Sequence, residues 1–209
     1  LNAGIVLLCV LPAVYILMRV SREPHPSEKE KIVEGHQWTR GEVIRDPLFW
    51  PLIFVLLGPP VIGTVIFFHQ VYLTELRGWA LGQFAGSTPV LSIAAIAMTF
   101  ISGHLIDKYH SAVLLAVMLV FTAIANFALA LVPDAWAILV FMAFMGGAFG
   151  VYATVFGAIW PELYGTRHLG SIKSMVTSIM VLSTAVGPGL SGWLIDLDIS
   201  YPVMISVMA

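Results

Sequence analysis

The sequence predicts an all-α fold, a bundle of helices that cross a lipid bilayer. Hydrophobic residues make up 59% of the chain and charged residues 11%, whereas soluble domains average about 25% charged residues. The mean hydropathy is +0.93. From Pro47 onward the charges fall in short clusters, and the uncharged stretches between them reach about 20 residues, the length of helix that crosses a hydrocarbon core.

The charge clusters divide the chain into predicted spans. The first has neither a basic leader nor a small-residue cleavage site, so we interpret it as a span and not as a signal peptide. The chain begins at Leu1 and ends at Ala209 inside an apolar run, so we expect an internal fragment whose last span is incomplete. In chain order the spans cover residues 1–18, 47–68, 81–103, 112–132, 136–160, 171–193 and those from Tyr201 on.

Glycine and proline predict that these spans bend and pack closely. Proline removes an intrahelical hydrogen bond, and we expect kinks at Gly58-Pro59-Pro60, Pro89 and Gly187-Pro188-Gly189. Two glycines four residues apart let helix backbones approach each other, as in Gly82/Gly86 and Gly146/Gly150. Both residue types are also common in membrane helices at large, so it is their combination that favours a mobile bundle.

Residues 19–46 are the predicted linker between two membrane domains. They contain six of the ten basic residues, together with five glutamates. Such a charge run is usually a solvated face, with a regulatory docking site as the alternative. Cytoplasmic loops carry the excess of Lys and Arg. A cytoplasmic linker also puts Lys108, Arg167 and Lys173 inside and leaves only Arg77 outside, which makes this orientation the predicted one.

One internal similarity predicts the arrangement of the spans. Ser102–Asp107 reads SGHLID at the end of the third span, and Ser191–Asp196 reads SGWLID at the end of the sixth. In the predicted topology these two ends lie on opposite sides of the membrane. Matching segments that end on opposite sides of the membrane are typical of inverted repeats in secondary transporters. The alternative is that a six-residue match in an apolar chain arises by chance.

These segments resemble the C-terminal half of the major facilitator superfamily. Gly103–His110 is similar to the loop motif G-xxx-D-[RK]-x-G-[RK], with His110 and Ser111 in place of its glycine and second basic residue. Pro161–Gly170 resembles the PE…R…G stretch between the tenth and eleventh helices, and Gly187–Gly192 the kinked end of the eleventh.

The resemblance implies a six-helix half of a major facilitator fold, built from an inverted three-plus-three repeat and preceded by one helix. Residues 1–18 would be the last helix of the N-terminal half, 19–46 the cytoplasmic linker and 47–209 the C-terminal transporter domain. The N-terminal six-helix half of the same chain would be its main partner, within the lipid bilayer. The alternation of helix and charge resembles the bacterial monocarboxylate and oxalate–formate porter branch.

Polar side chains inside spans are the candidate site residues, because a buried polar group in lipid is costly unless it is paired or faces water. Ser174, Thr177 and Ser178 follow one face of the sixth span, with Tyr152 at similar depth in the fifth. The alternative is that such hydroxyls bond to their own helix carbonyls. The helices that line the cavity in the family add further contacts, of which we select His69 and Gln83.

Charged groups near the span ends suggest coupling and gating. Histidine titrates near physiological pH, so His69 is a candidate for proton coupling, or else an interfacial residue. Lys173 can hold an anion or extend to the cytoplasm. The resemblance implies a cytoplasmic gate, formed by Asp107, Lys108, Glu162 and Arg167.

The sequence thus predicts a secondary active transporter that moves a small solute by alternating access, and an organic anion such as a monocarboxylate is favoured. The alternatives are a proton-coupled exporter of drugs or metabolites and a transporter-like membrane sensor. No catalytic, cofactor, metal or nucleic-acid motif is recognised, so we expect neither an enzyme nor a cofactor. A co-transported proton and the small-molecule substrate are the expected ligands, and the bacterial plasma membrane is the expected location.

Overall fold

The computed structural model describes residues 36–109 and 111–208. The chain divides into two compact units, Leu1–His36 and Gln37–Ala209. Every helix described below belongs to the second unit. The predicted first span, residues 1–18, lies outside the described residues.

Within the described residues the structure is helical and has no strand, which confirms the predicted fold class. Lipid offers no hydrogen-bond partners to the backbone, so a spanning segment must satisfy its own peptide groups as a helix. The segments long and apolar enough to cross a membrane are α5 (Phe49–Phe68), α7 (Leu81–Gly86) continued by α8 (Thr88–Ile106), α9 (Ser111–Leu131), α10 (Ala137–Tyr164) and α11 (Leu169–Asp196). Shorter helices are α4 (Arg40–Arg45), α6 (Gln70–Arg77) and α12 (Tyr201–Met208).

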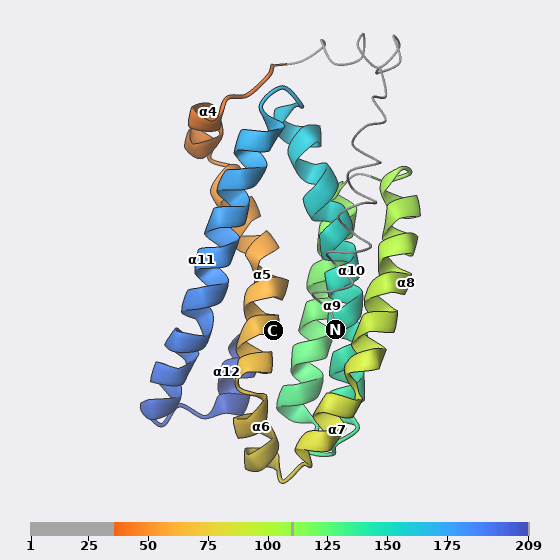
Figure 1. Cartoon of the computed structure of the whole chain (residues 1–209), viewed down its shortest axis with the longest axis vertical. Coiled ribbons are helices and arrows are strands. Elements are labelled where there is room, and N and C mark those ends of the chain that lie inside the picture. Colours follow the sequence, from red (N-terminus) through yellow and green to blue (C-terminus); the bar gives the residue numbers. More distant parts are fainter. Residues whose placement is uncertain (1–35, 110, 209) are drawn as a thin grey trace, which may run out of the picture. The chain divides into compact units, whose positions relative to one another are not determined.

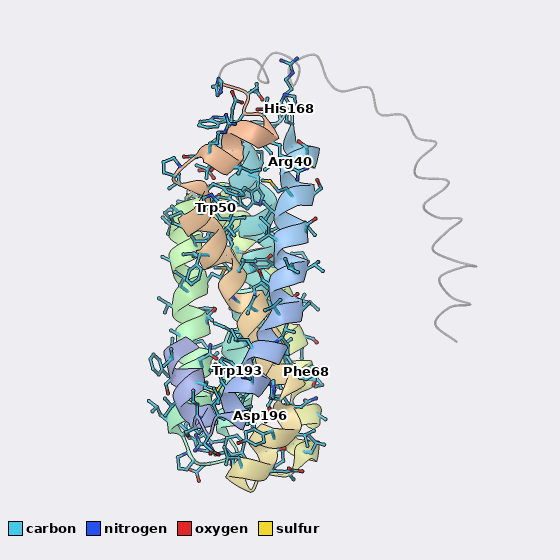
Figure 2. The ribbon with its side chains drawn as sticks, turned by 90° about the vertical axis from the view of Figure 1, so that its left-hand side faces the viewer. Arg40, Trp50, Phe68, His168, Trp193 and Asp196 are labelled. Atoms are coloured by element: carbon cyan, nitrogen blue, oxygen red, sulfur yellow. The ribbon has the colours of Figure 1, made fainter. Side chains whose placement is uncertain are left out.

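The spanning helices run antiparallel, so their loops gather at two ends (Figure 1). The α8–α9 loop, the α10–α11 hairpin and α4 share one end, which we call the α4 end. The short helices α6, α7 and α12 lie at the other end, which we call the α6 end. Figure 2 shows Arg40 and His168 at the α4 end and Asp196 towards the α6 end. The described basic residues other than Arg77 therefore lie at or near the α4 end, as expected if they face the same side of the membrane.

Helix α10 is the centre of the bundle. In its apolar stretch 56% of the residues are buried, against 17% in α11 and 6% in the α7–α8 span. It packs chiefly against α8 and α9, while α11 packs chiefly against α5. A side chain at Gly146 or Gly150 would collide with the backbone of α8, so the predicted close approach at this pair is confirmed. At Gly82 and Gly86 an added Cβ would meet no described atom within 4 Å, so this pair marks no close contact there.

Two of the long segments are interrupted near the α6 end. Ser87 separates α7 from α8, and Pro89 stands in the first turn of α8, where a missing N–H costs no helical bond. His69 separates α5 from α6 with non-helical backbone angles. Proline inside a helix occurs at Pro59 and Pro60 of α5, Pro161 of α10 and Pro188 of α11.

Arg77 ties the α6–α7 turn to the end of α9. Its Nη2 donates to the carbonyls of Leu129 and Ala130 at 3.0 and 2.5 Å. The Nε1 of Trp79 donates to the Pro133 carbonyl at 3.0 Å. Carbonyls at a helix C-terminus attract cations, so these bonds staple the loops at the α6 end together.

Candidate functional site

The predicted hydroxyl stripe of α11 is open in the structure. Ser174, Thr177 and Ser178 are all exposed. The hydroxyl of Ser174 donates to the Ser171 carbonyl at 3.0 Å, and that of Ser178 to the Ser174 carbonyl at 2.9 Å. Thr177 and Ser178 line a shallow groove of about 410 Å³ together with Val181, Leu182 and Ala185. The hydroxyls of Ser174 and Ser178 thus bond to their own helix, while Thr177 and Ser178 are accessible from the groove.

Tyr152 reaches the same helix from α10. Its hydroxyl donates to the Sδ of Met180 at 2.9 Å, and Met180 stands one turn beyond Thr177. A thioether is a weak acceptor, so a ligand oxygen can replace it at little cost. The structure therefore brings Tyr152 to the boundary of the α11 stripe, and Met180 is a neighbour that the sequence did not indicate.

Lys173 is held between α10 and α11. Its Nζ donates to the Gly157 carbonyl at 3.1 Å. This carbonyl lacks its usual helical donor because Pro161, four residues later, has no N–H. The described partner of the ammonium group is therefore a neutral carbonyl, and two of its hydrogens remain for other acceptors. Spacings of three and four residues place Thr177 and Met180 on the same face of α11 as Lys173.

An aromatic stripe leads from Tyr152 along α10 toward the α4 end. Neighbouring rings four residues apart have centroids 5.4 Å apart for Tyr152 and Phe156, 6.2 Å for Phe156 and Trp160, and 6.3 Å for Trp160 and Tyr164. Trp160 and Tyr164 are buried. The stripe makes the α10 wall beside Lys173 rigid and apolar.

The other two predicted contacts lie away from this group, toward the α6 end. His69 is half-buried, and its Nδ1 lies 3.0 Å from the Val65 carbonyl. Its Nε2 faces α11, 3.6 Å from where a Cβ on Gly192 would stand. Gln83 is exposed and accepts the backbone N–H of Ala80 at 3.3 Å at the start of α7. The structure does not bring His69 or Gln83 together with Tyr152 and the α11 stripe.

The four predicted gate residues lie at the α4 end, Asp107 and Lys108 after α8, Glu162 on α10 and Arg167 in the α10–α11 hairpin. Asp107 caps the end of α8 and is exposed. The Nζ of Lys108 lies 5.6 Å from the centroid of the Tyr109 ring. Glu162 accepts the Ser111 hydroxyl and so joins α10 to the start of α9. The backbone N–H of Arg167 donates to the Oε1 of Gln37 at 3.1 Å.

The described part of the chain thus has a cation and a tyrosine hydroxyl between α10 and α11, beside a stripe of hydroxyls. Such a group can bind a small molecule that accepts hydrogen bonds. A sequence model of the Major Facilitator Superfamily matches residues 1–188. No curated protein and no solved structure matches the chain. Together with membrane-spanning helices, this match identifies the chain as a member of the Major Facilitator Superfamily, a family of secondary transporters of small solutes.

Proposed function

We propose that this multi-pass membrane transporter moves a small organic anion, such as a monocarboxylate, by alternating access. The observation that carries the proposal is Lys173. Its ammonium lies between two spanning helices, and its described partner is a carbonyl, not a carboxylate. An unneutralised charge near lipid is costly, and a bound anion would offset that cost.

The neighbours of Lys173 support the same class of solute. Thr177 is one turn from Lys173 on α11, and one turn further along α11 the thioether of Met180 accepts the hydroxyl of Tyr152 from α10. One carboxylate accepts several hydrogen bonds, so an anion held by Lys173 can also accept the hydroxyl of Thr177, and Tyr152 can donate to a solute that extends along α11. Ser174 and Ser178 border this position, while His69 and Gln83 are proposed as contacts nearer the other end.

The alternative is export of an apolar drug or metabolite. Phe156 and Met180 beside Tyr152 favour it, because an aromatic ring and a thioether bind apolar surfaces of varied shape. A transporter-like sensor is the third candidate class. We further propose a bacterial plasma membrane as the location and a cytoplasmic position for the 19–46 linker and for the gate residues Asp107, Lys108, Glu162 and Arg167.

The test is uptake by the complete protein in proteoliposomes. The probes are radiolabelled formate, acetate, lactate and oxalate, with ethidium as a cationic drug. Lys173→Gln should raise the half-saturating anion concentration by roughly ten- to a hundredfold, as expected for one lost bond to a charged group. Tyr152→Phe and Thr177→Val should each raise it less.

Arg40→Gln is the matched control, since it removes an exposed cation at the same end that belongs to neither the proposed anion site nor the proposed gate, and it should leave saturation unchanged. Transport of ethidium without transport of any of the four anions would overturn the anion proposal in favour of export. Equal saturation curves for Lys173→Gln and the parent protein would exclude Lys173 as the group that binds the anion.

A further inference from the structure

The end of the 19–46 linker is bound to the transporter domain at the α10–α11 hairpin. We call residues Gln37–Asp46 the strap. The backbone N–H of Trp38 donates to the Tyr164 carbonyl at 3.2 Å, and the Oε1 of Gln37 accepts the backbone N–H of Arg167 at 3.1 Å. The strap therefore bonds to main-chain groups of the hairpin on both sides of the hairpin turn. It does so once through its own backbone and once through the side chain of Gln37.

The turn of the hairpin is shaped for this contact. Gly165 has φ +78°, a conformation that side chains rarely adopt, and an added Cβ would lie 2.5 Å from the Oε1 of Gln37. Glycine is thus required here for its backbone angles, and an added Cβ would also displace the Gln37 side chain from its contact. The ring of Trp38 packs edge-on against Tyr164 with centroids 5.5 Å apart.

The far end of the strap is tied to the same tyrosine. The hydroxyl of Tyr164 donates to the Oδ2 of Asp46 at 2.8 Å, while the Oδ1 of Asp46 accepts the backbone N–H of Leu48 at 3.1 Å. Between these ties, Val43 is fully buried in the cluster that contains Tyr164 and Ile172. One residue of α10, Tyr164, thus contacts both ends of the strap, through its carbonyl and ring at Trp38 and through its hydroxyl at Asp46.

The strap has little stability of its own. Its helix, α4, has six residues, and helices shorter than about 12 residues are marginal in water. The Oε2 of Glu42 accepts both the backbone N–H and the hydroxyl of Thr39, at 2.6 and 2.8 Å, and so closes its first turn. The helix therefore depends on its contacts with the domain, and docking and folding of the strap are coupled.

The position of the strap determines what its release would do. Helix α11 packs chiefly against α5, and α10 chiefly against α8 and α9, so the bundle contains two groups of helices. At the α4 end the strap contacts the last turn of α10 and continues directly into α5. We propose that the strap clamps these two groups together and that its release is a step in their separation at this end.

The experiment uses the complete protein with Cys9→Ser and a reporter cysteine at Ile172, which is buried in the same cluster as Val43 and Tyr164, in membrane vesicles whose α4 end faces the reagent. The rate of labelling by a membrane-impermeant maleimide measures opening and needs no substrate. Tyr164→Phe removes only the hydroxyl bound to Asp46 and should raise the rate by about tenfold, the scale of one bond to a charged group. Gln37→Ala removes a different tie and should act in the same direction.

Tyr109→Phe is the control, because this exposed tyrosine lies at the same end and outside the strap, and it should not change the rate. Amide exchange of Val43 and Asp46 should quicken in the two strap variants and not in the control. The proposal is overturned if either strap variant exchanges faster in the strap but labels at the parent rate, or if both match Tyr109→Phe in labelling and exchange. These readouts are independent of the solute, so a failed anion test leaves this result unaffected.

Discussion

At the scale of single residues, one hydrogen bond of His69 determines which of its two ring nitrogens carries the hydrogen. A carbonyl only accepts, so the Nδ1 that lies 3.0 Å from the Val65 carbonyl carries the hydrogen. In the neutral ring Nε2 is then the free acceptor, and it faces Gly192 of α11. Two phenol rings stand beside the imidazole. The ring centroid of Tyr201 lies 5.9 Å from that of His69, and the ring centroid of Tyr72 lies 5.6 Å from that of Tyr201. The charged side chains of α6, of the nearby end of α11 and of the loop that follows it are Glu75, Arg77, Asp196 and Asp198.

This geometry leads to a test of proton coupling. His69→Asn keeps an N–H donor near the position of Nδ1 but has no group that takes a proton, so folding should persist and the pH dependence of lactate uptake between about pH 5 and 8 should flatten. His104→Asn, in the last turn of α8 at the α4 end, should retain the parent profile. Uptake by proteoliposomes at a series of pH values provides the measurement, and identical profiles for all three proteins would exclude His69 as the coupling group.

At the scale of elements, the contact between α8 and α10 is the tightest test of packing. Gly146 and Gly150 lie against the backbone near Leu91 and Ala95, where no flexible side chain can yield. Gly146→Ala or Gly150→Ala must therefore push the helices apart, at a cost of about 1–3 kcal/mol. Gly82→Ala and Gly86→Ala add a methyl group in open space and should be near neutral. Thermal unfolding of the purified protein would show this difference, and equal melting temperatures would contradict it.

At the scale of the whole molecule, the described residues form a bundle whose outer helices keep open apolar faces. Ile93, Phe100 and Leu182 are exposed on α8 and α11. In water such surfaces would associate, whereas in a membrane they face lipid or another group of helices. Orientation is the property of this bundle that charge decides, because the Lys and Arg residues gather at one end.

Cysteine labelling in a Cys9→Ser background tests that orientation. Glu75→Cys and Lys108→Cys place reporters at exposed positions at opposite ends. A membrane-impermeant maleimide should label Glu75→Cys in intact cells and Lys108→Cys only after permeabilisation. Arg77 is unsuitable as a reporter because it staples α6 to α9. The reverse labelling pattern would show that the α4 end is external.

The sequence by itself determined the helical class, the five described spans and the charge asymmetry between their ends. These properties follow from local composition, because a bilayer imposes one secondary structure and one minimum length on any apolar segment. Spacing also predicted the close approach at Gly146 and Gly150, but it did not separate this pair from Gly82 and Gly86. The difference depends on which helix lies opposite, and a single segment does not encode that.

Only the tertiary structure decided how the polar groups are used. It showed Lys173 bound to the carbonyl that Pro161 leaves free, Tyr152 bound to Met180 and the linker end bound to Tyr164. Each contact joins residues on different elements, and the local sequence around either residue does not indicate its partner. Helical periodicity predicts which face of a helix is polar. The partner of that face is decided by how the helices cross, which is a property of the packed bundle.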